Sequence, residues 1–420
     1  MHCGTGMQES GRSPKVAVLD TIHGAGTIAQ RMVEGGIFAE ALEVYHHEPS
    51  VLDFDLVAAP VHLPLSNPVL AEARRLGKKI ITHHQAVGEL MASSVKPGLE
   101  IFEVTGTHSK TSTALLLAKM LSTQKLVLTH TTRGLELWGD GKASVLHSGL
   151  SITPGNVIPA VAAADAQGAE ALISEISLGG TGLADWGILT SFSGDYRIAK
   201  ETKWASTAKL QMVSLARKGA RLVASTDVPI SPDVSFGQRG KVRAKSDRLL
   251  FGHEELLLTL GEDLDFPGYQ TAIAAAGAVA LFAGIPPENI YQALQGFDGF
   301  SGRMKVQREG RLTIYDSSNS GLKVRDVNLA LDRARGPRLG VVVGEDAETV
   351  CEGMNIPGLL ELLRARRDEM DLLVLVGERL APYAGDLRAG WARDLVAGQE
   401  TALSASASLD RLLLCVKCFR

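Results

Sequence analysis

The segment from residue 99 to residue 121 constrains the possible folds more than any other part of this sequence. An apolar run at 99–104 is followed by a polar loop at 105–112, and then by a stretch of helical composition without a breaker at 113–121. This order predicts a strand, a turn and a helix. Because backbone N–H groups at a helix start lack partners within the helix, such a turn binds phosphate. The segment therefore favours a nucleotide-binding α/β domain.

The loop carries residue types that suit a nucleoside triphosphate. Gly106 allows the backbone to approach a phosphate closely. Lys110 offers a mobile positive charge, and the Thr111 hydroxyl is the usual magnesium ligand of such a loop. We therefore predict ATP and Mg²⁺ as ligands, and the simpler alternative is a turn that binds nothing. The loop residues predicted to bind ATP are Gly106, Thr107, His108, Ser109, Lys110, Thr111 and Ser112.

Length and charge exclude several kinds of partner. With 420 residues the chain is long enough for roughly two to four domains. Its formal net charge of −4 gives no reason to expect nucleic acid or an anionic membrane, and no apolar run approaches the roughly 18 residues that span a bilayer. Four cysteines make no disulfide framework in such a long chain. We expect a cytoplasmic protein, in which Cys415 and Cys418 are either structural or a metal or redox pair.

Before the nucleotide loop, short apolar runs alternate with helical stretches, which predicts a small parallel sheet. Residues 1–14 have the composition of a disordered leader. Gly24 and Gly26 match the loose dinucleotide pattern Gly-x-Gly-x-x-Gly/Ala. We interpret these glycines as shaping a turn into a helix, with a bound dinucleotide as the alternative. The expected strands cover residues 15–19, 54–59 and 79–82, and the expected helices cover residues 27–34 and 67–76.

Histidines follow each of these expected strands. His23 comes after the first strand, His62 after the second, and His83 and His84 after the third. The carboxyl ends of parallel strands meet at one edge of a sheet, where ligands of open α/β sheets bind. We therefore predict that these four imidazoles contribute to a substrate site, although each one alone also fits a hydrogen-bonded structural histidine.

The loop resembles the pattern Thr-Gly-Thr-x-Gly-Lys-Thr/Ser of the Mur ligases and folylpolyglutamate synthetases, with Ser109 in place of a glycine. Further motifs follow in the order of that family. Glu175, after an apolar strand at 169–173, is similar to the family's magnesium-binding glutamate in Glu-x-Ser-Ser. Lys209 matches the lysine of Ala-Ala-Lys, which is often carbamylated to assist magnesium. The resemblance implies metal ligands Thr111 and Glu175, and catalytic roles for Lys110 and Lys209.

The resemblance continues into the last third of the chain. Gly302-Arg303-Met304 is similar to the Gly-Arg-Met/Phe motif that opens the family's third domain, and it implies that Arg303 approaches the terminal phosphate. Asp316 matches an aspartate that contacts the ribose or fixes the hinge. Thr271 stands where the family has an asparagine that contacts adenine. An aspartate of the family's Asn-x-Asp-Asp strand end is kept as Asp227.

As a member of this family, the chain is expected to have a three-domain α/β fold. The resemblance implies a Rossmann-like N-terminal substrate domain at 15–95, a central P-loop ATPase domain at 96–296 and a Rossmann-like C-terminal domain at 297–420. Runs at 338–344 and 371–377 that end in glycine support the third domain.

Three short segments point to one branch of the family. Residues 19–24, 57–63 and 105–111 are similar to the archaeal coenzyme F(430) synthetases. That resemblance implies ATP-dependent activation of a carboxylate as an acyl phosphate, followed by closure of a carbocyclic ring on a nickel tetrapyrrole. The expected partner is therefore a small, anionic, nickel-containing macrocycle.

Two other functions remain open. One is a conventional amide-forming ligase that joins an amino acid to a carboxylate. The other is a nucleotide-binding module without catalysis, supported by departures from the family pattern. Besides Ser109, these departures are Ser191 for asparagine, Tyr196 for histidine, Gln270 for histidine and Thr271 for asparagine.

Overall fold

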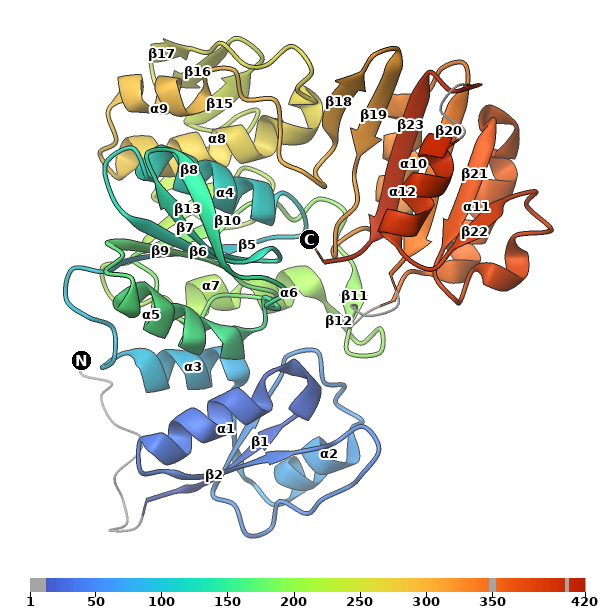
Figure 1. The fold of residues 1–420 in the computed structure, drawn as a ribbon. Helices are drawn as coiled ribbons and strands as arrows, with labels where there is room; N and C mark the ends of the chain where they lie inside the picture. The colour runs from blue at the N-terminus through green and yellow to red at the C-terminus, as the bar shows by residue number, and fades with distance from the viewer. Residues whose placement is uncertain (1–12, 347–352, 405–407, 420) are drawn as a thin grey trace. The chain divides into compact units, whose positions relative to one another are not determined.

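The computed structural model describes residues 13–346, 353–404 and 408–419. Contacts divide the chain into two compact units, Met1–Leu256 with Thr271–Ala293, and Leu257–Gln270 with Leu294–Arg420. Most of the leader expected at residues 1–14, with Cys3 and also Cys351, lies outside the described residues. Three large sheets organise the described part, and parallel strands dominate them, which confirms the predicted α/β class (Figure 1).

The N-terminal sheet is fully parallel, as predicted, and has the strand order β2-β1-β3-β4. Strand β2 was not expected, because its sequence is short and rich in alanine, and its pattern of exposure is that of a sheet edge. Helix α1 begins earlier than predicted because Gly24, at φ 94°, forms its N-cap. The elements are β1 (Lys15–Leu19), η1 (Thr21–His23), α1 (Ala25–Glu34), β2 (Phe38–Leu42), β3 (Leu56–Ala59), α2 (Pro68–Arg75), β4 (Lys79–Thr82) and α3 (His83–Met91).

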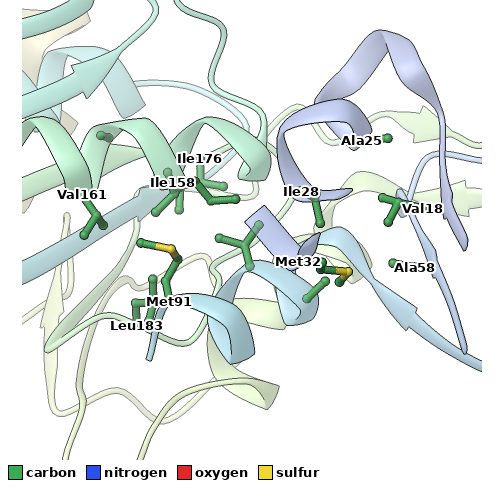
Figure 2. Packing of buried hydrophobic residues seen from close by; sticks show 14 of the residues in the cluster. Val18, Ala25, Ile28, Met32, Ala58, Met91, Ile158, Val161, Ile176 and Leu183 are labelled. Carbon is green, nitrogen blue, oxygen red and sulfur yellow. The ribbon is translucent and has the colours of Figure 1, made fainter. Parts of the chain in front are cut away.

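Alternation along β1 places side chains in two different cores. Val16 and Val18 face α1 and α3, whereas Ala17 and Leu19 face the opposite layer with α2. The first of these cores continues without interruption into the central region, where it includes Ile158 and Ile176 (Figure 2). Helices α1 and α3 are therefore buried between the N-terminal sheet and the central region, and this packing fixes the N-terminal sheet against the central region.

The central sheet has the strand order β17-β16-β15-β14-β13-β10-β5-β9-β6-β7-β8. Its strands are β5 (Glu100–Thr105), β6 (Val127–Thr131), β7 (Gly134–Gly139), β8 (Lys142–His147), β9 (Ala171–Glu175), β10 (Trp186–Leu189), β13 (Arg221–Ser225), β14 (Val234–Phe236), β15 (Val242–Lys245), β16 (Arg248–Phe251) and β17 (Glu254–Leu257). Strand β5 lies between β10 and β9, parallel to both. The loop that follows β5 therefore emerges at the centre of the sheet.

Helices cover both faces of the central sheet. Helix α4 (Lys110–Leu121) and helix α5 (Val157–Ala166) lie on opposite sides of β6 and β9 (Figure 1). Two short strands, β11 (Arg197–Ile198) and β12 (Lys203–Trp204), form a separate ribbon before α6 (Ala205–Lys209). The remaining elements are η2 (Pro154–Asn156), α7 (Gln211–Ser214), α8 (Phe266–Phe282) and α9 (Pro287–Leu294).

The third sheet has the order β18-β19-β23-β20-β21-β22, and only the edge strand β18 is antiparallel. Alternate residues of β23 enter different cores: Leu413 faces α10 and α11, and Leu414 faces α12. Cys415 is free and buried in the same sheet, where burial raises the pKa of its thiol. The elements are β18 (Lys305–Glu309), β19 (Leu312–Asp316), α10 (Val324–Ala334), β20 (Leu339–Glu345), α11 (Ile356–Ala365), η3 (Arg367–Glu369), β21 (Leu372–Val376), η4 (Ala381–Tyr383), β22 (Gly390–Ala392), α12 (Leu395–Ser404) and β23 (Arg411–Lys417).

Across the described ranges, no helix has both the length and the apolar character needed to cross a bilayer.

Candidate active site

Gly106 cannot be replaced without moving the nucleotide loop. Its φ angle is +151°, and a Cβ atom there would lie 2.0 Å from Oγ1 of Thr190. That hydroxyl donates to the carbonyl oxygens of Thr105 (3.2 Å) and His108 (2.6 Å). Thr190 thus holds the loop from the end of the neighbouring strand β10. Thr190 stands where the family's Thr-Asn-x-x-x-Asp-His segment begins, but nothing in the sequence indicates its contact with the loop.

Ser109 has a left-handed conformation, which a glycine would adopt without steric cost. Its φ angle is 62°, and it forms the N-cap of α4 without a capping hydrogen bond from its side chain. A side chain in this region costs roughly 1–2 kcal/mol. The hydroxyl lies 3.1 Å from Nδ1 of His108. Ser112, in the first turn of α4, is buried.

Lys110, Thr111 and Glu175 come together at the start of α4. The Thr111 hydroxyl donates to Oε2 of Glu175 (2.7 Å), and the Lys110 ammonium lies 3.8 Å from Oε1. Glu175 is only 2% exposed and also accepts from the backbone N–H of Thr132 (3.4 Å). A hydroxyl and a carboxylate side by side are oxygen ligands of the kind that Mg²⁺ takes. The structure therefore brings the two predicted metal ligands into contact, beside the predicted phosphate-binding lysine.

A second set of contacts fixes the loop on its other side. The Thr107 hydroxyl donates to the carbonyl oxygens of Ser191 (3.0 Å) and Ser193 (2.7 Å). Those two residues are held in turn by Asp227, whose Oδ2 accepts from the Ser191 hydroxyl (2.5 Å) and the Ser193 N–H (2.9 Å). Burial raises the pKa of Asp227, but these hydrogen bonds outweigh it and hold the pKa below its usual range. Asp227 is thus an ionised support of the loop.

Lys209 is buried rather than solvated. Its side chain is 1% exposed at the end of α6, and its ammonium lies 5.8 Å from the centre of the Tyr196 ring. The carboxylate of Asp195 fixes the start of α6 by accepting hydrogen bonds from the N–H (3.0 Å) and the hydroxyl (2.5 Å) of Ser206. Asp195 therefore fixes the start of the helix that carries Lys209, and Tyr196 lies beside the Lys209 ammonium.

The second unit contains two of the predicted residues. Arg303 follows a turn in which its N–H donates to the carbonyl oxygen of Phe300 (3.0 Å). Asp316, at the end of β19, is buried and accepts from the Gly302 N–H (2.8 Å). Asp316 therefore holds the turn that carries Arg303. Thr271 lies in α8 and is half-buried. The roles of these three residues toward ATP stay predictions.

His23 and His62 meet at the carboxyl edge of the N-terminal sheet. Their rings pack edge to face with centroids 4.5 Å apart. Both contact Oδ2 of the fully buried Asp20, His23 through Nδ1 (2.6 Å) and His62 through Nε2 (3.1 Å). The Tyr45 hydroxyl donates to the same oxygen (2.9 Å). The spacing of Asp20 and His23 could have been noticed in the sequence, whereas nothing in it connects Tyr45 to them.

His83 and His84 have a different environment from that of His23 and His62. Both are buried at the start of α3. Burial lowers the pKa of His83 to about 3 and that of His84 to about 4, so both rings are neutral. Nε2 of His84 lies 2.8 Å from the carbonyl oxygen of Ser177, and Nδ1 lies 3.4 Å from the Gln211 amide. His84 therefore joins α3 to the segment that follows Glu175.

Relatives of the chain are found over nearly its whole length. The family model described as "Coenzyme F430 synthetase CfbE, C-terminal domain" matches residues 306–418. A coenzyme F(430) synthetase from Methanosarcina acetivorans is 35% identical over 470 aligned residues, covering 97% of this chain and 99% of the relative. The chain belongs to the coenzyme F(430) synthetase family.

Solved structures of Mur-type ligases share the fold. MurF from Acinetobacter baumannii matches with a TM-score of 0.57 and 14% identity, over 93% of this chain and 94% of that protein. A folylpolyglutamate synthase/dihydrofolate synthase from Yersinia pestis, complexed with AMPPNP and a Mn ion, matches with a TM-score of 0.53 and 18% identity, over 80% and 90%. The predicted Mur ligase-like fold and the predicted ATP-dependent ligase class are confirmed.

Proposed function

We propose that this protein closes a carbocyclic ring on a nickel tetrapyrrole, using ATP to activate a carboxylate of that substrate. The observation that carries the proposal is the contact of Lys110 and Thr111 with Glu175 at the start of α4, in a chain of the coenzyme F(430) synthetase family. A positive charge and two oxygen ligands at a helix start support a site for the phosphates of ATP and their metal ion.

The proposed reaction has two steps. A carboxylate oxygen of the substrate attacks the γ-phosphorus of ATP, the bond to the β-phosphate oxygen breaks, and ADP leaves. The product is an acyl phosphate. A carbon of the same molecule then attacks the acyl carbon, the bond to phosphate breaks, and the attacking carbon loses a proton to solvent. Because both reacting ends belong to one bound molecule, positioning supplies much of the rate.

The residues of the central region divide the work of the first step. Gly106 and the residues after it bind the phosphates through the backbone, and Lys110 stabilises charge on the transferred group. Thr111 and Glu175 would hold Mg²⁺, which neutralises phosphate charge when bound. Their carboxylate-and-hydroxyl chemistry fits this ion.

Other assignments extend the proposal on the strength of the family motifs. Lys209 assists magnesium, in a carbamylated form, and its burial at the end of α6 gives such a modification a fixed place. Arg303 stabilises the terminal phosphate, Thr271 lies toward adenine, and Asp316 contacts ribose or fixes the hinge. We also retain three domains, at 15–95, 96–296 and 297–420, in keeping with the three large sheets.

The N-terminal domain would bind the macrocycle. His23 and His62 are partly exposed at the sheet edge and suit an anionic, metal-containing ligand, whereas His83 and His84 would support that edge from below the surface. We also propose that the reaction takes place in the cytoplasm, where the four cysteines of the chain would stay reduced.

The test is turnover of the purified protein with ATP, Mg²⁺ and a nickel tetrapyrrole whose ring is still open. We expect the release of one ADP for each ring closed. Chromatography and the visible spectrum of the macrocycle measure ring closure. ADP release that instead requires an added amino acid would identify an amide-forming ligase. ATP binding without ADP release in the presence of the open-ring macrocycle would favour the non-catalytic module.

A further inference from the structure

Three strand ends of the N-terminal sheet bring polar side chains to one point. Asp20 follows β1, Tyr45 lies three residues beyond the end of β2, and His62 lies three residues beyond the end of β3. Because β1 is paired in parallel with both β2 and β3, all three segments leave the sheet at the same edge. His23 joins them from the 3-10 turn after Asp20.

The carboxylate at the centre of this group is held in place from behind. Oδ1 of Asp20 accepts hydrogen bonds from the backbone N–H groups of Ile22 (3.0 Å) and His23 (3.3 Å). Asp20 adopts a left-handed conformation, with φ at 78°, which a non-glycine residue maintains only at a cost. The backbone is thus shaped so that Oδ2 is left to face the side chains.

Three side chains converge on this one oxygen. His23 Nδ1 lies 2.6 Å from Oδ2, the Tyr45 hydroxyl lies 2.9 Å away and His62 Nε2 lies 3.1 Å away. The candidate ligand atoms of Asp20, His23 and His62 all lie within 4.8 Å of one another, and this is the single group of three or more such residues found among the described parts of the chain. Two imidazole nitrogens and a carboxylate oxygen form a ligand set that suits first-row transition ions.

We infer that Asp20, His23 and His62 form a binding site for a divalent first-row transition ion, separate from the magnesium site at Glu175. The two sites differ in chemistry, because Thr111 and Glu175 offer only oxygen, whereas this group offers two nitrogens. An ion at this point would be ligated by Oδ2, Nδ1 and Nε2.

Exposure and charge fit such a site. The Asp20 side chain is 0% exposed, whereas those of His23 and His62 are 19% and 27% exposed, so the open positions of the ion would face solvent. The Asp20 carboxylate supplies negative charge for a divalent cation, and the two imidazoles supply the nitrogen ligands.

The site lies where the N-terminal sheet meets the central region. A Cβ atom on Gly24, next to His23, would lie 3.4 Å from the Gly155 Cα atom, and the Lys203 ammonium donates to the carbonyl oxygen of Val61 (3.2 Å). If the proposed function holds, the open positions of the ion are available to a carboxylate of the macrocycle. Ion binding itself requires neither ATP nor the macrocycle.

The experiment titrates the full chain with Co²⁺, in excess Mg²⁺ to fill the oxygen site, and follows the visible bands of the cobalt ion. We expect one equivalent to bind with the bands of a nitrogen-containing site, and Zn²⁺ to displace it. His23→Ala and His62→Ala should each weaken Co²⁺ binding by about 100-fold. Removing a residue that only supports a metal ligand already weakens metal binding by about 10-fold to 100-fold. His47→Ala is the matched control, because His47 is an exposed histidine of the same domain outside the group.

Circular dichroism keeps the test decisive if one variant is destabilised. His62→Ala removes a partly exposed side chain and should keep the wild-type far-ultraviolet spectrum even if His23→Ala is destabilised. Equal cobalt affinity and equal bands in folded wild type, His23→Ala and His62→Ala would overturn the inference. Because no turnover is measured, that result would leave the proposed ligase reaction untouched.

Discussion

The nucleotide loop and the histidine edge of the N-terminal sheet are built in opposite ways. The loop is one run of eight residues whose backbone we propose to bind phosphate, and Thr190 and Asp227 support it from neighbouring strands. The edge is assembled from single side chains at three strand ends around Asp20. A contiguous motif reveals its chemistry in the sequence, whereas an assembled site becomes visible only when the pairing of the strands is known.

The two regions also differ in how they neutralise a buried carboxylate. Glu175 has Lys110 and the Thr111 hydroxyl as partners, and we propose roles toward ATP and its metal for both. Asp20 has two imidazoles and a phenol, and none of these groups carries a permanent charge. Substitutions in the loop should therefore act on ATP, and substitutions at the edge on the other substrate.

The largest expected effect lies in the loop. Lys110→Ala should lower ATP turnover by about 10³-fold, because it removes a charge that stabilises the transferred phosphoryl group. ADP release measures the effect, and Lys142→Ala, on the exposed strand β8, is the control. If Lys110→Ala also abolished binding of the nickel macrocycle, ATP binding and macrocycle binding would not belong to two different regions. Normal ADP release by folded Lys110→Ala protein would remove Lys110 from the site.

The reciprocal substitution is His62→Ala, at the carboxyl edge of the N-terminal sheet. His62→Ala should weaken binding of the nickel macrocycle by about 10-fold to 100-fold, the range for losing a hydrogen bond to a charged group. ATP affinity should not change, because His62 belongs to the N-terminal sheet rather than the nucleotide loop. Fluorescence titration with the macrocycle and with ATP separates the two. Equal losses of both affinities would contradict the division.

Much of the fold could be predicted because its strands are apolar runs between clear turn residues. Strands β1 and β4 begin and end at the predicted residues, and α4 follows β5 as the loop pattern requires. Strand β2 was missed because an alanine-rich edge strand has little apolar signal. In the site, Thr111 and Glu175 were predicted from motifs, whereas Thr190 and Tyr45 act through contacts between strands distant in sequence.

A smaller effect concerns the buried histidines behind the edge. Burial holds the pKa of His84 at about 4 in the folded protein, whereas an unfolded histidine has a pKa of about 6.5. Below about pH 6.5 the unfolded chain takes up a proton that the folded chain does not. The free energy of unfolding should therefore fall as the pH falls, by about 1.4 kcal/mol per pH unit for this group, until about pH 4.

Urea unfolding of the wild type and His84→Gln between about pH 6.5 and pH 4 measures this slope, since the substitution removes the titrating ring. The slope should become shallower by the stated amount in His84→Gln, while His253→Gln, at an exposed position, serves as the control. Parallel slopes for the wild type and His84→Gln would show that His84 is not held neutral by burial.

The smallest effect returns to the loop and tests its strain. Ser109→Gly should raise the free energy of unfolding by about 0.5 kcal/mol, because relief of a left-handed serine, worth roughly 1–2 kcal/mol, exceeds the added entropy of an unfolded glycine. Ser112→Gly is the matched change, since Ser112 lies in the first turn of α4, where glycine costs about 1 kcal/mol. The same substitution three residues apart should thus change stability in opposite directions, as urea unfolding would measure. Destabilisation of similar size at both positions would show that Ser109 is not strained, and that the loop tolerates serine as readily as the family's glycine.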